Sequence, residues 1–329
     1  MRVLHMAHMA PPVHNAGAET HTHTLLRALA DAGHHVDVLL SRPLTGGDYI
    51  HDGVAVHGWR SKGDPMRFLP EVDVITCHLE NTPRATFLGK LWRKPVVHVC
   101  HNDMGGIREW LKHPAVTLAV YNTDWMAREL APVHGGRSVV VHPYPDAADY
   151  ACPPGDRVTL VNLWPDKGGE VFAELARRLP NVAFLGVIGA YGDPQVTPDL
   201  PNVDITAHTA DLRGDVLSRT RLLLMPSSYE SFGRVAAEAM CAGIPVIAHP
   251  TPGLLENLSD AGTFVDREDV DGWAAAITRL LRPRAWKAAS TRAAARAAEQ
   301  QAQRAGELAA WVDAMESIAA RNRRLVAAL

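Results

Sequence analysis

Cysteine is scarce in this chain, and recognised metal-binding motifs are missing. The 329 residues include four cysteines, none in C-x-x-C spacing, at positions Cys77, Cys100, Cys152 and Cys241. This pattern argues against a disulfide-stapled secreted fold and against a cysteine zinc site. Among the 17 histidines there is no H-E-x-x-H motif, and His21 and His23 are two residues apart, on different sides of a helix. We therefore expect reduced thiols, a cytoplasmic location and no metal.

Long apolar runs and an excess of one charge are missing as well. No apolar run reaches the roughly 18 residues that a membrane-spanning helix needs, so we expect no stable membrane insertion. The first residues, MRVLHMAHMAPP, are interrupted by His and Pro, unlike a signal peptide. The formal net charge is −3 and neither half is basic, which argues against a domain-wide nucleic-acid footprint. We interpret two local basic patches as solvent-exposed faces. One comprises Lys90, Arg93 and Lys94, and the other Arg321, Arg323 and Arg324.

What the chain does have is an alternation of short apolar runs and helical segments. Val3–Met6 and Val96–Cys100 are typical of the first half, and Leu222–Met225 of the second. This alternation predicts an α/β fold of parallel sheets covered by helices. The proline-rich segment from 143 to 155 has no periodicity, so we expect lobes at residues 1–150 and 151–310. The Ala-rich tail from 286 to 329 predicts two or more helices.

The segment from 226 to 245, PSSYESFGRVAAEAMCAGIP, carries the strongest chemical signal. A strand ends at Met225, a polar turn follows, and a helix begins after Gly233. Glu230 lies in the turn and Glu238 eight residues later in the helix. Small residues, including Ser231, let a ligand approach the helix N-terminus, where free N–H groups favour an anion or many hydroxyls. The segment therefore predicts a site for a polyhydroxylated, phosphate-bearing molecule.

This segment, S-S-Y-E-S-F-G-R-V-A-A-E-A-M-C-A-G-I-P-V-I, resembles the signature of the family-4 glycosyltransferases. The resemblance implies the GT-B fold: two Rossmann-like lobes with parallel sheets facing across a cleft, and a last helix, residues 311–329, crossing back to the first lobe. It implies retaining, metal-independent transfer from a nucleotide-diphospho-sugar. It also implies that Glu230 lies against the donor sugar, that Glu238 holds the ribose hydroxyls, and that the backbone at Ser231, Phe232 and Gly233 meets the sugar.

A second segment, NLWPDKGG from 162 to 169, resembles the family segment that meets the donor diphosphate. The resemblance assigns this role to Lys167, which stands before Gly168. A lysine charge suits a diphosphate leaving group when no Mg²⁺ is used. Asn162 stands where many members carry a second cation, and it can hydrogen-bond a phosphate without neutralising it. A solvent-exposed lysine at a turn is the competing interpretation.

Two more segments resemble family elements in the first half. Ala16–Glu19, AGAE, resembles a Gly-Gly-x-Glu loop in which Ala16 replaces the first glycine, and Gly17 would bring backbone amides to the phosphates or the acceptor. An ordinary helix start is the alternative. The strand VVHVC ends before His101, which resembles the histidine that contacts the donor sugar near the reacting carbon. The alternative is a core histidine, which is what we expect of His98.

The hypothesis is thus a retaining hexosyltransferase that uses a UDP-sugar, or second a GDP-sugar, as co-substrate without another cofactor. His101, Lys167 and Glu230 would be catalytic, and the leaving diphosphate would deprotonate the acceptor hydroxyl. The expected acceptor is a soluble small molecule or glycan, with a modified nucleic acid or a lipid left open. The alternatives are a non-catalytic nucleotide-sugar-binding protein, a sugar-nucleotide epimerase or phosphorylase, and a dinucleotide-dependent oxidoreductase, for which a G-x-G-x-x-G motif is missing.

Overall fold

The computed structural model describes residues 1–61, 64–190 and 192–328, and these form two compact units. The first unit comprises Met1–Pro143 and Arg304–Leu329, and the second comprises Tyr144–Gln303. The second unit begins at Tyr144 because the ring of this residue is buried in the hydrophobic core of that unit, beside Phe232.

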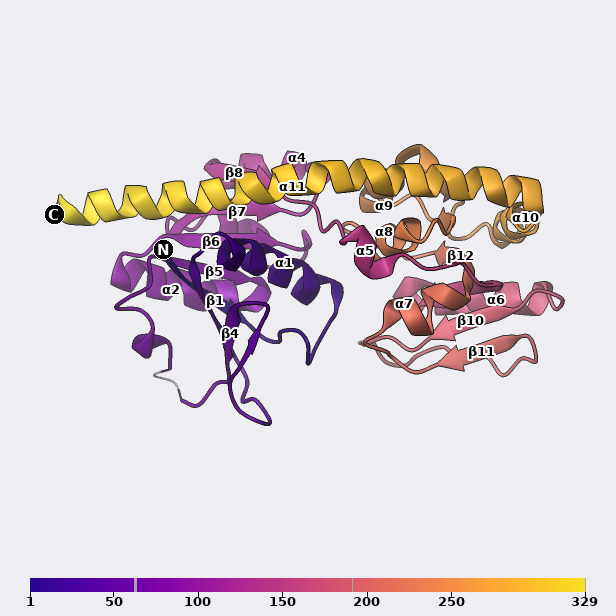
Figure 1. Cartoon of the computed structure of the whole chain (residues 1–329), viewed down its shortest axis with the longest axis horizontal. Helices are drawn as coiled ribbons and strands as arrows, with labels where there is room; N and C mark the ends of the chain where they lie inside the picture. The colour runs from indigo at the N-terminus through magenta and orange to yellow at the C-terminus, as the bar shows by residue number, and fades with distance from the viewer. Residues whose placement is uncertain (62–63, 191, 329) are drawn as a thin grey trace. The chain divides into compact units, whose positions relative to one another are not determined.

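One eight-stranded sheet forms the centre of the first unit, in the order β3-β4-β2-β1-β5-β6-β7-β8. All neighbouring strands are parallel except β3 and β4. The elements, coloured from indigo to magenta in Figure 1, are β1 (Arg2–Ala7), α1 (Gly17–Asp31), β2 (His35–Leu40), β3 (Tyr49–His51), β4 (Val54–His57), β5 (Val74–His78), α2 (Thr82–Trp92), β6 (Val96–Cys100), α3 (Ile107–Leu111), β7 (Val116–Tyr121), α4 (Asp124–His134) and β8 (Arg137–Val140).

The sequence of these strands explains their position. In β1, consecutive residues such as Val3 and Leu4 are buried, as expected of a parallel strand covered on both faces. Leu25 and Leu29 of helix α1 belong to the same hydrophobic cluster as Val36 and Val38 of β2. The apolar stripe of α1 therefore covers this part of the sheet.

A hairpin at the edge of this sheet, β3–β4, is an element that the sequence analysis did not anticipate. Its connection is Asp52–Gly53, and both residues have positive φ, +47° and +77°. Asp-Gly with two positive φ values is the preferred type I′ connection of a two-residue hairpin. His51 pairs with Val54 across the connection, so the turn fixes the direction of both neighbouring side chains.

A six-stranded parallel sheet forms the centre of the second unit, in the order β11-β10-β9-β12-β13-β14. Its strands are β9 (Arg157–Val161), β10 (Phe184–Val187), β11 (Val203–Thr206), β12 (Thr220–Met225), β13 (Val246–Ala248) and β14 (Thr263–Phe264). Its helices are α5 (Ala147–Tyr150), α6 (Gly169–Arg178), α7 (Leu212–Asp215), α8 (Arg234–Cys241), α9 (Pro252–Leu258) and α10 (Val270–Leu280).

The C-terminal segment is one helix, α11 (Pro283–Ala327), of 45 residues, so the expectation of two or more helices was wrong. After Pro283 the segment has no proline, and its many alanines favour an unbroken helix despite Gly306. From Arg304 onward α11 belongs to the first unit, where Trp311 is buried and its indole N–H donates to the Leu25 carbonyl, at 2.9 Å. No helix in the described part of the chain combines the length and the apolar character needed to cross a membrane.

Candidate functional site

An ion pair joins two loops at one edge of the second sheet. Lys167 ends a 3₁₀ turn after β9, and Glu230 lies in the loop after β12. Because β9 and β12 are adjacent and parallel, their carboxyl ends meet at the same edge. Lys167 Nζ donates to Glu230 Oε1 at 2.6 Å, and Ser227 Oγ donates to the same oxygen at 2.9 Å. The two charged side chains are 17% and 14% exposed, so the pair is partly desolvated.

The backbones of the same two loops are also joined. The Ser228 N–H donates to the Asp166 carbonyl at 2.8 Å. The guanidinium of Arg267 donates to the carbonyls of Pro165 (2.6 Å), Asp166 (3.0 Å) and Pro226 (2.8 Å). Arg267 therefore links the loop that carries Lys167 with the loop that carries Glu230. The sequence analysis missed this arginine, because nothing local marks a residue whose role is set by tertiary packing.

Gly168 lets these loops approach closely. Its φ is +95°, and a Cβ added there would lie 2.2 Å from Cγ of Pro226. Only glycine combines this backbone conformation with this contact. The glycine that follows Lys167 is therefore needed for the geometry of the ion pair.

The backbone at Phe232 and Gly233 is held by Asn257 of α9, which is itself bonded to α11. Asn257 Nδ2 donates to the carbonyls of Phe232 (3.0 Å) and Gly233 (2.9 Å). The Asn257 side-chain oxygen accepts in turn from Gln300 Nε2 of α11 at 2.8 Å. Gly233, with φ +80°, is the N-cap of α8, and Phe232 is buried, with its ring edge-on to Tyr144. Asn257 and Gln300 are further residues that the sequence analysis missed.

Glu238 lies on α8 and is paired within that helix. Arg234 Nε donates to Glu238 Oε1 at 2.8 Å, one helical turn away, and Arg234 Nη2 lies 3.5 Å from the Tyr150 hydroxyl. Burial, reinforced by the charge of Glu238, raises the pKa of Tyr150 to about 12 and that of Cys241 to about 12. Tyr150 and Cys241 are therefore neutral at physiological pH, and the charge of this cluster resides on Arg234 and Glu238.

Asn162 occupies a turn directly after β9. Its φ is +70°, and its side-chain oxygen accepts from the Trp164 N–H at 3.1 Å. A Cβ at Gly189 would lie 2.2 Å from Asn162 Cγ, so the amide is tightly enclosed. Asparagine tolerates the left-handed conformation better than most residues, so the local backbone conformation is enough to explain an asparagine at position 162. Its contact with the donor diphosphate stays a prediction.

Gly17 and His101 belong to the first unit, whereas the other predicted site residues belong to the second. Gly17 is the first residue of α1, and a Cβ added there would meet no atom within 4 Å. Neither its backbone conformation nor its local packing demands glycine. Its role at the helix N-terminus therefore stays a prediction.

His101 follows β6 and lies in a buried cluster of histidines and threonines. Its Nε2 is 2.9 Å from Thr22 Oγ1 and 3.2 Å from His78 Nδ1. Burial, with repulsion from neighbouring histidines, holds its pKa well below the usual range, so the ring is neutral. His98 is fully buried on β6 and bonded to Thr82 Oγ1 at 2.9 Å, as expected of a core histidine.

Both units contain regions that match known protein families. Residues 15–149 match the family described as Glycosyltransferase Family 4, and residues 158–283 match Glycosyl transferases group 1. The D-inositol 3-phosphate glycosyltransferase of Mycobacterium marinum is 33% identical over 199 residues, which are 50% of this chain and 42% of that protein. The Mycobacterium avium protein of the same name is 33% identical over 210 residues, 54% of this chain and 49% of that one. The chain thus spans about half the length of the curated relatives that it matches.

Solved structures with the same architecture cover the whole chain. Anabaena HepE in complex with UDP-glucose superimposes with a TM-score of 0.74 at 17% identity, covering 100% of both chains. Sucrose-phosphate synthase of Thermosynechococcus elongatus gives 0.70 at 18% identity, also with 100% coverage of both. At such identities the likeness concerns the fold, which is GT-B. The chain belongs to the glycosyltransferases, with a family 4 domain followed by a group 1 domain on the GT-B fold.

Proposed function

We propose that this protein transfers a hexose from a UDP-sugar to an acceptor hydroxyl, with retention of configuration and without a metal. A GDP-sugar is the second candidate donor. The observation that carries the proposal is the Lys167–Glu230 pair at the shared strand edge, inside the region that matches the group 1 family. The choice of UDP is supported by similar structures that are described as complexes with UDP-glucose or UDP.

Lys167 and Glu230 would contact different parts of the donor. When the donor binds, Lys167 neutralises the charge that develops on the leaving diphosphate, and the N-terminus of α8 after Gly233 adds a positive dipole. Glu230 stays within reach of Lys167 and accepts hydrogen bonds from the sugar hydroxyls. The bond between the anomeric carbon and the diphosphate breaks while the acceptor oxygen bonds on the same face. The acceptor proton passes to the departing phosphate oxygen.

Two further residues would orient the donor. Glu238 accepts hydrogen bonds from the ribose hydroxyls, and Arg234 holds its carboxylate from the preceding turn of α8. His101 contacts the sugar as a neutral ring, because burial keeps it deprotonated, and it therefore contributes a hydrogen bond rather than a charge.

The proposed acceptor is a soluble small molecule or glycan. Support comes from the names of the relatives, D-inositol 3-phosphate glycosyltransferases, and from HepE, which is also described in complex with UDP and glucose. We place the reaction in the cytoplasm, because all four cysteines are free thiols, which persist under reducing conditions.

Donor turnover measured in EDTA tests this proposal. UDP-glucose and GDP-glucose are offered with a panel of soluble sugars and polyols, and release of the nucleoside diphosphate is followed. Lys167→Ala should lower kcat/KM by about a hundredfold or more, since charge stabilisation of the leaving group is lost. Lys287→Ala, an exposed lysine of the same unit, is the matched control and should keep full activity. A near-normal rate in Lys167→Ala would overturn the mechanism, and donor binding without any turnover would favour a non-catalytic binding protein.

A further inference from the structure

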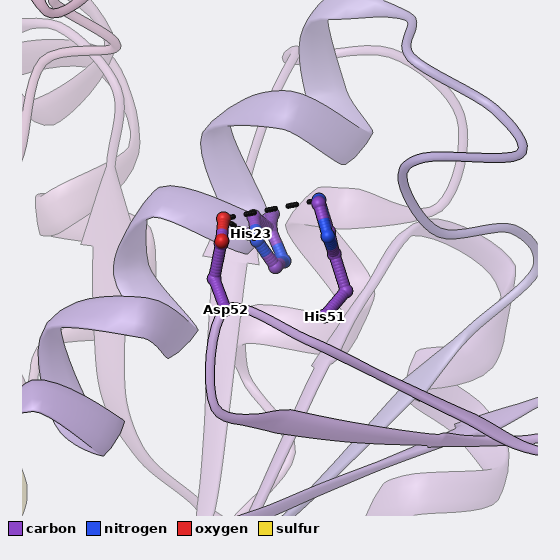
Figure 2. Close-up of side chains that lie close together, drawn as sticks. All are labelled: His23, His51 and Asp52. Atoms are coloured by element: carbon purple, nitrogen blue, oxygen red, sulfur yellow. Dashed lines mark hydrogen bonds and ion pairs between the residues drawn. The ribbon is translucent and has the colours of Figure 1, made fainter.

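Two histidines and an aspartate meet where the tip of the β3–β4 hairpin lies against α1. His51 and Asp52 come from the hairpin, and His23 comes from the second turn of α1. A Cβ at Gly53 would lie 3.4 Å from Ala30 Cβ, which shows how closely the tip packs on the helix. Figure 2 shows the three side chains facing one another, two from the hairpin and one from the helix.

The three groups are at distances that suit a small cation. His23 Nε2 lies 3.1 Å from Asp52 Oδ2, and His51 Nε2 lies 3.8 Å from the same oxygen. All three ligand atoms are within 4.8 Å of one another. The two imidazoles are stacked, with ring planes 19° apart, so one ring must rotate for both nitrogen lone pairs to meet at one metal. Ligand bonds of about 2.0–2.2 Å in a tetrahedron around Zn²⁺ separate neighbouring ligand atoms by about 3.3 Å. Side-chain shifts of about 1 Å would therefore complete three corners.

We propose that His23, His51 and Asp52 form a binding site for a divalent transition metal of the Zn²⁺ type. Two imidazoles and one carboxylate are a ligand set that Zn²⁺ accepts, with water at the fourth corner. His23 then carries its proton on Nδ1 and offers the Nε2 lone pair to the metal. The sequence expectation of no metal rested on local motifs, and this cluster joins residues 28 positions apart along the chain.

Asp52 is the acidic member of the three ligands, and it also has a cationic neighbour. One group opposes a cation: Arg27 Nη1 lies 3.7 Å from Asp52 Oδ2. Arg27 Nε also lies 3.6 Å from Asp31, so this guanidinium keeps a carboxylate partner when the metal takes Asp52.

Rigid elements hold the ligands in place. The type I′ connection fixes His51 and Asp52 next to each other, and α1 is anchored in the core through Leu25 and Leu29. A metal here would tie the hairpin to α1. It would stabilise the first unit and would share no residue with the proposed donor-binding set.

Titration of the EDTA-treated, dialysed full chain with ZnCl₂ alone tests the site by calorimetry. We expect saturable binding of one Zn²⁺ per chain and an increase in the melting temperature. Asp52→Asn keeps a turn sequence, Asn-Gly, that forms the same hairpin, and it removes the charged ligand. Loss of an outer-shell partner alone weakens metal sites by about 10–100-fold, so Asp52→Asn and His51→Gln should weaken binding at least tenfold.

Two further variants make the test specific. His208→Gln removes an exposed histidine of the second unit and should leave the affinity unchanged. Arg27→Gln removes the competing cation and should tighten binding. Melting curves recorded in EDTA would establish whether each variant folds. If a histidine variant fails to fold, Asp52→Asn still tests the proposal. Wild-type affinity in Asp52→Asn, or the absence of saturable one-to-one binding, would overturn the proposal.

Discussion

Lys167 Nζ and Glu230 Oε1 lie 2.6 Å apart although the two residues are 63 positions apart in the sequence. The pair exists because β9 and β12 are neighbours, and because Arg267 bonds to carbonyls of both loops that follow these strands. Partial burial makes each charge dependent on the other, since an unpaired charge would lose solvation without compensation.

This dependence predicts a measurable coupling. Lys167→Met leaves the Glu230 carboxylate partly buried without its cation and should lower the free energy of unfolding by about 1–3 kcal/mol, between the values of exposed and buried pairs. Adding Glu230→Gln removes the unpaired charge and should restore most of the loss. Urea unfolding of the single and double variants measures both effects. Strictly additive losses would contradict an energetic coupling.

A second prediction concerns two glycines. Gly168→Ala forces a side chain into a left-handed backbone conformation against Pro226, and should lower the free energy of unfolding by about 1–3 kcal/mol and disturb the Lys167 loop. Gly17→Ala meets no atom within 4 Å and should change stability by less than about 1 kcal/mol. Thermal unfolding compares the two variants. Equal losses would show that the close approach at Gly168 does not matter.

The residues next to a strand end or a helix start could be singled out from the sequence, Glu230 and Gly233 from a local pattern and Lys167 from its resemblance to a family segment. Their roles at a donor site stay predictions. Glu230, Gly233 and Lys167 follow buried strands, and the periodicity that predicts those strands also places these residues at one edge. Arg267, Asn257 and Gln300 were missed because they act on backbone carbonyls far away in sequence, and no local pattern encodes such a partner.

The fold shows the same division between local and long-range information. The two α/β lobes follow from the alternation of apolar runs and helices. The Asp52–Gly53 signal for a hairpin is present in the sequence, but β3 is only three residues long and its pattern is too short to stand out. The length of α11 was missed because two helices and one share the same composition.

Asn257 should prove essential for the loop before α8. Asn257→Ala removes the side-chain hydrogen bonds to the Phe232 and Gly233 carbonyls, although the Gly233 carbonyl still accepts from the Ala236 N–H at 3.0 Å. Loss of these two buried hydrogen bonds should lower the free energy of unfolding by about 1–3 kcal/mol. Because the loop carries Ser231 and Gly233, binding of a nucleoside diphosphate should weaken as well, measured by calorimetry.

Asn202 provides the matched control for that variant. Its amide also donates to backbone carbonyls of the second unit, those of Ala176, Leu179 and Val182, which support α6 and the turn after it. Asn202→Ala should therefore destabilise to a similar extent but leave nucleotide affinity unchanged. Similar losses of affinity in both variants would mean that affinity follows global stability rather than the loop.

The buried histidines predict acid sensitivity of the first unit. Burial lowers the pKa of His98 to about 3 from its ordinary value of 6.5, so the folded state holds this ring neutral while the unfolded chain binds a proton below pH 6.5. The resulting stability is present above pH 6.5 and is lost as the pH falls from 6.5 towards 3. Each such histidine contributes a slope of about 1.4 kcal/mol per pH unit in that window.

His98→Gln isolates this contribution. The amide can keep a hydrogen bond to Thr82 but cannot take up a proton. Between neutral and mildly acidic pH, the slope of the unfolding free energy against pH should therefore fall by the contribution of one histidine, about 1.4 kcal/mol per pH unit. Urea unfolding at several pH values in this window gives the slope directly. His208→Gln, at an exposed position of the second unit, controls for the substitution itself. An unchanged slope in His98→Gln would mean that His98 takes up its proton in the folded protein at the same pH as in the unfolded chain.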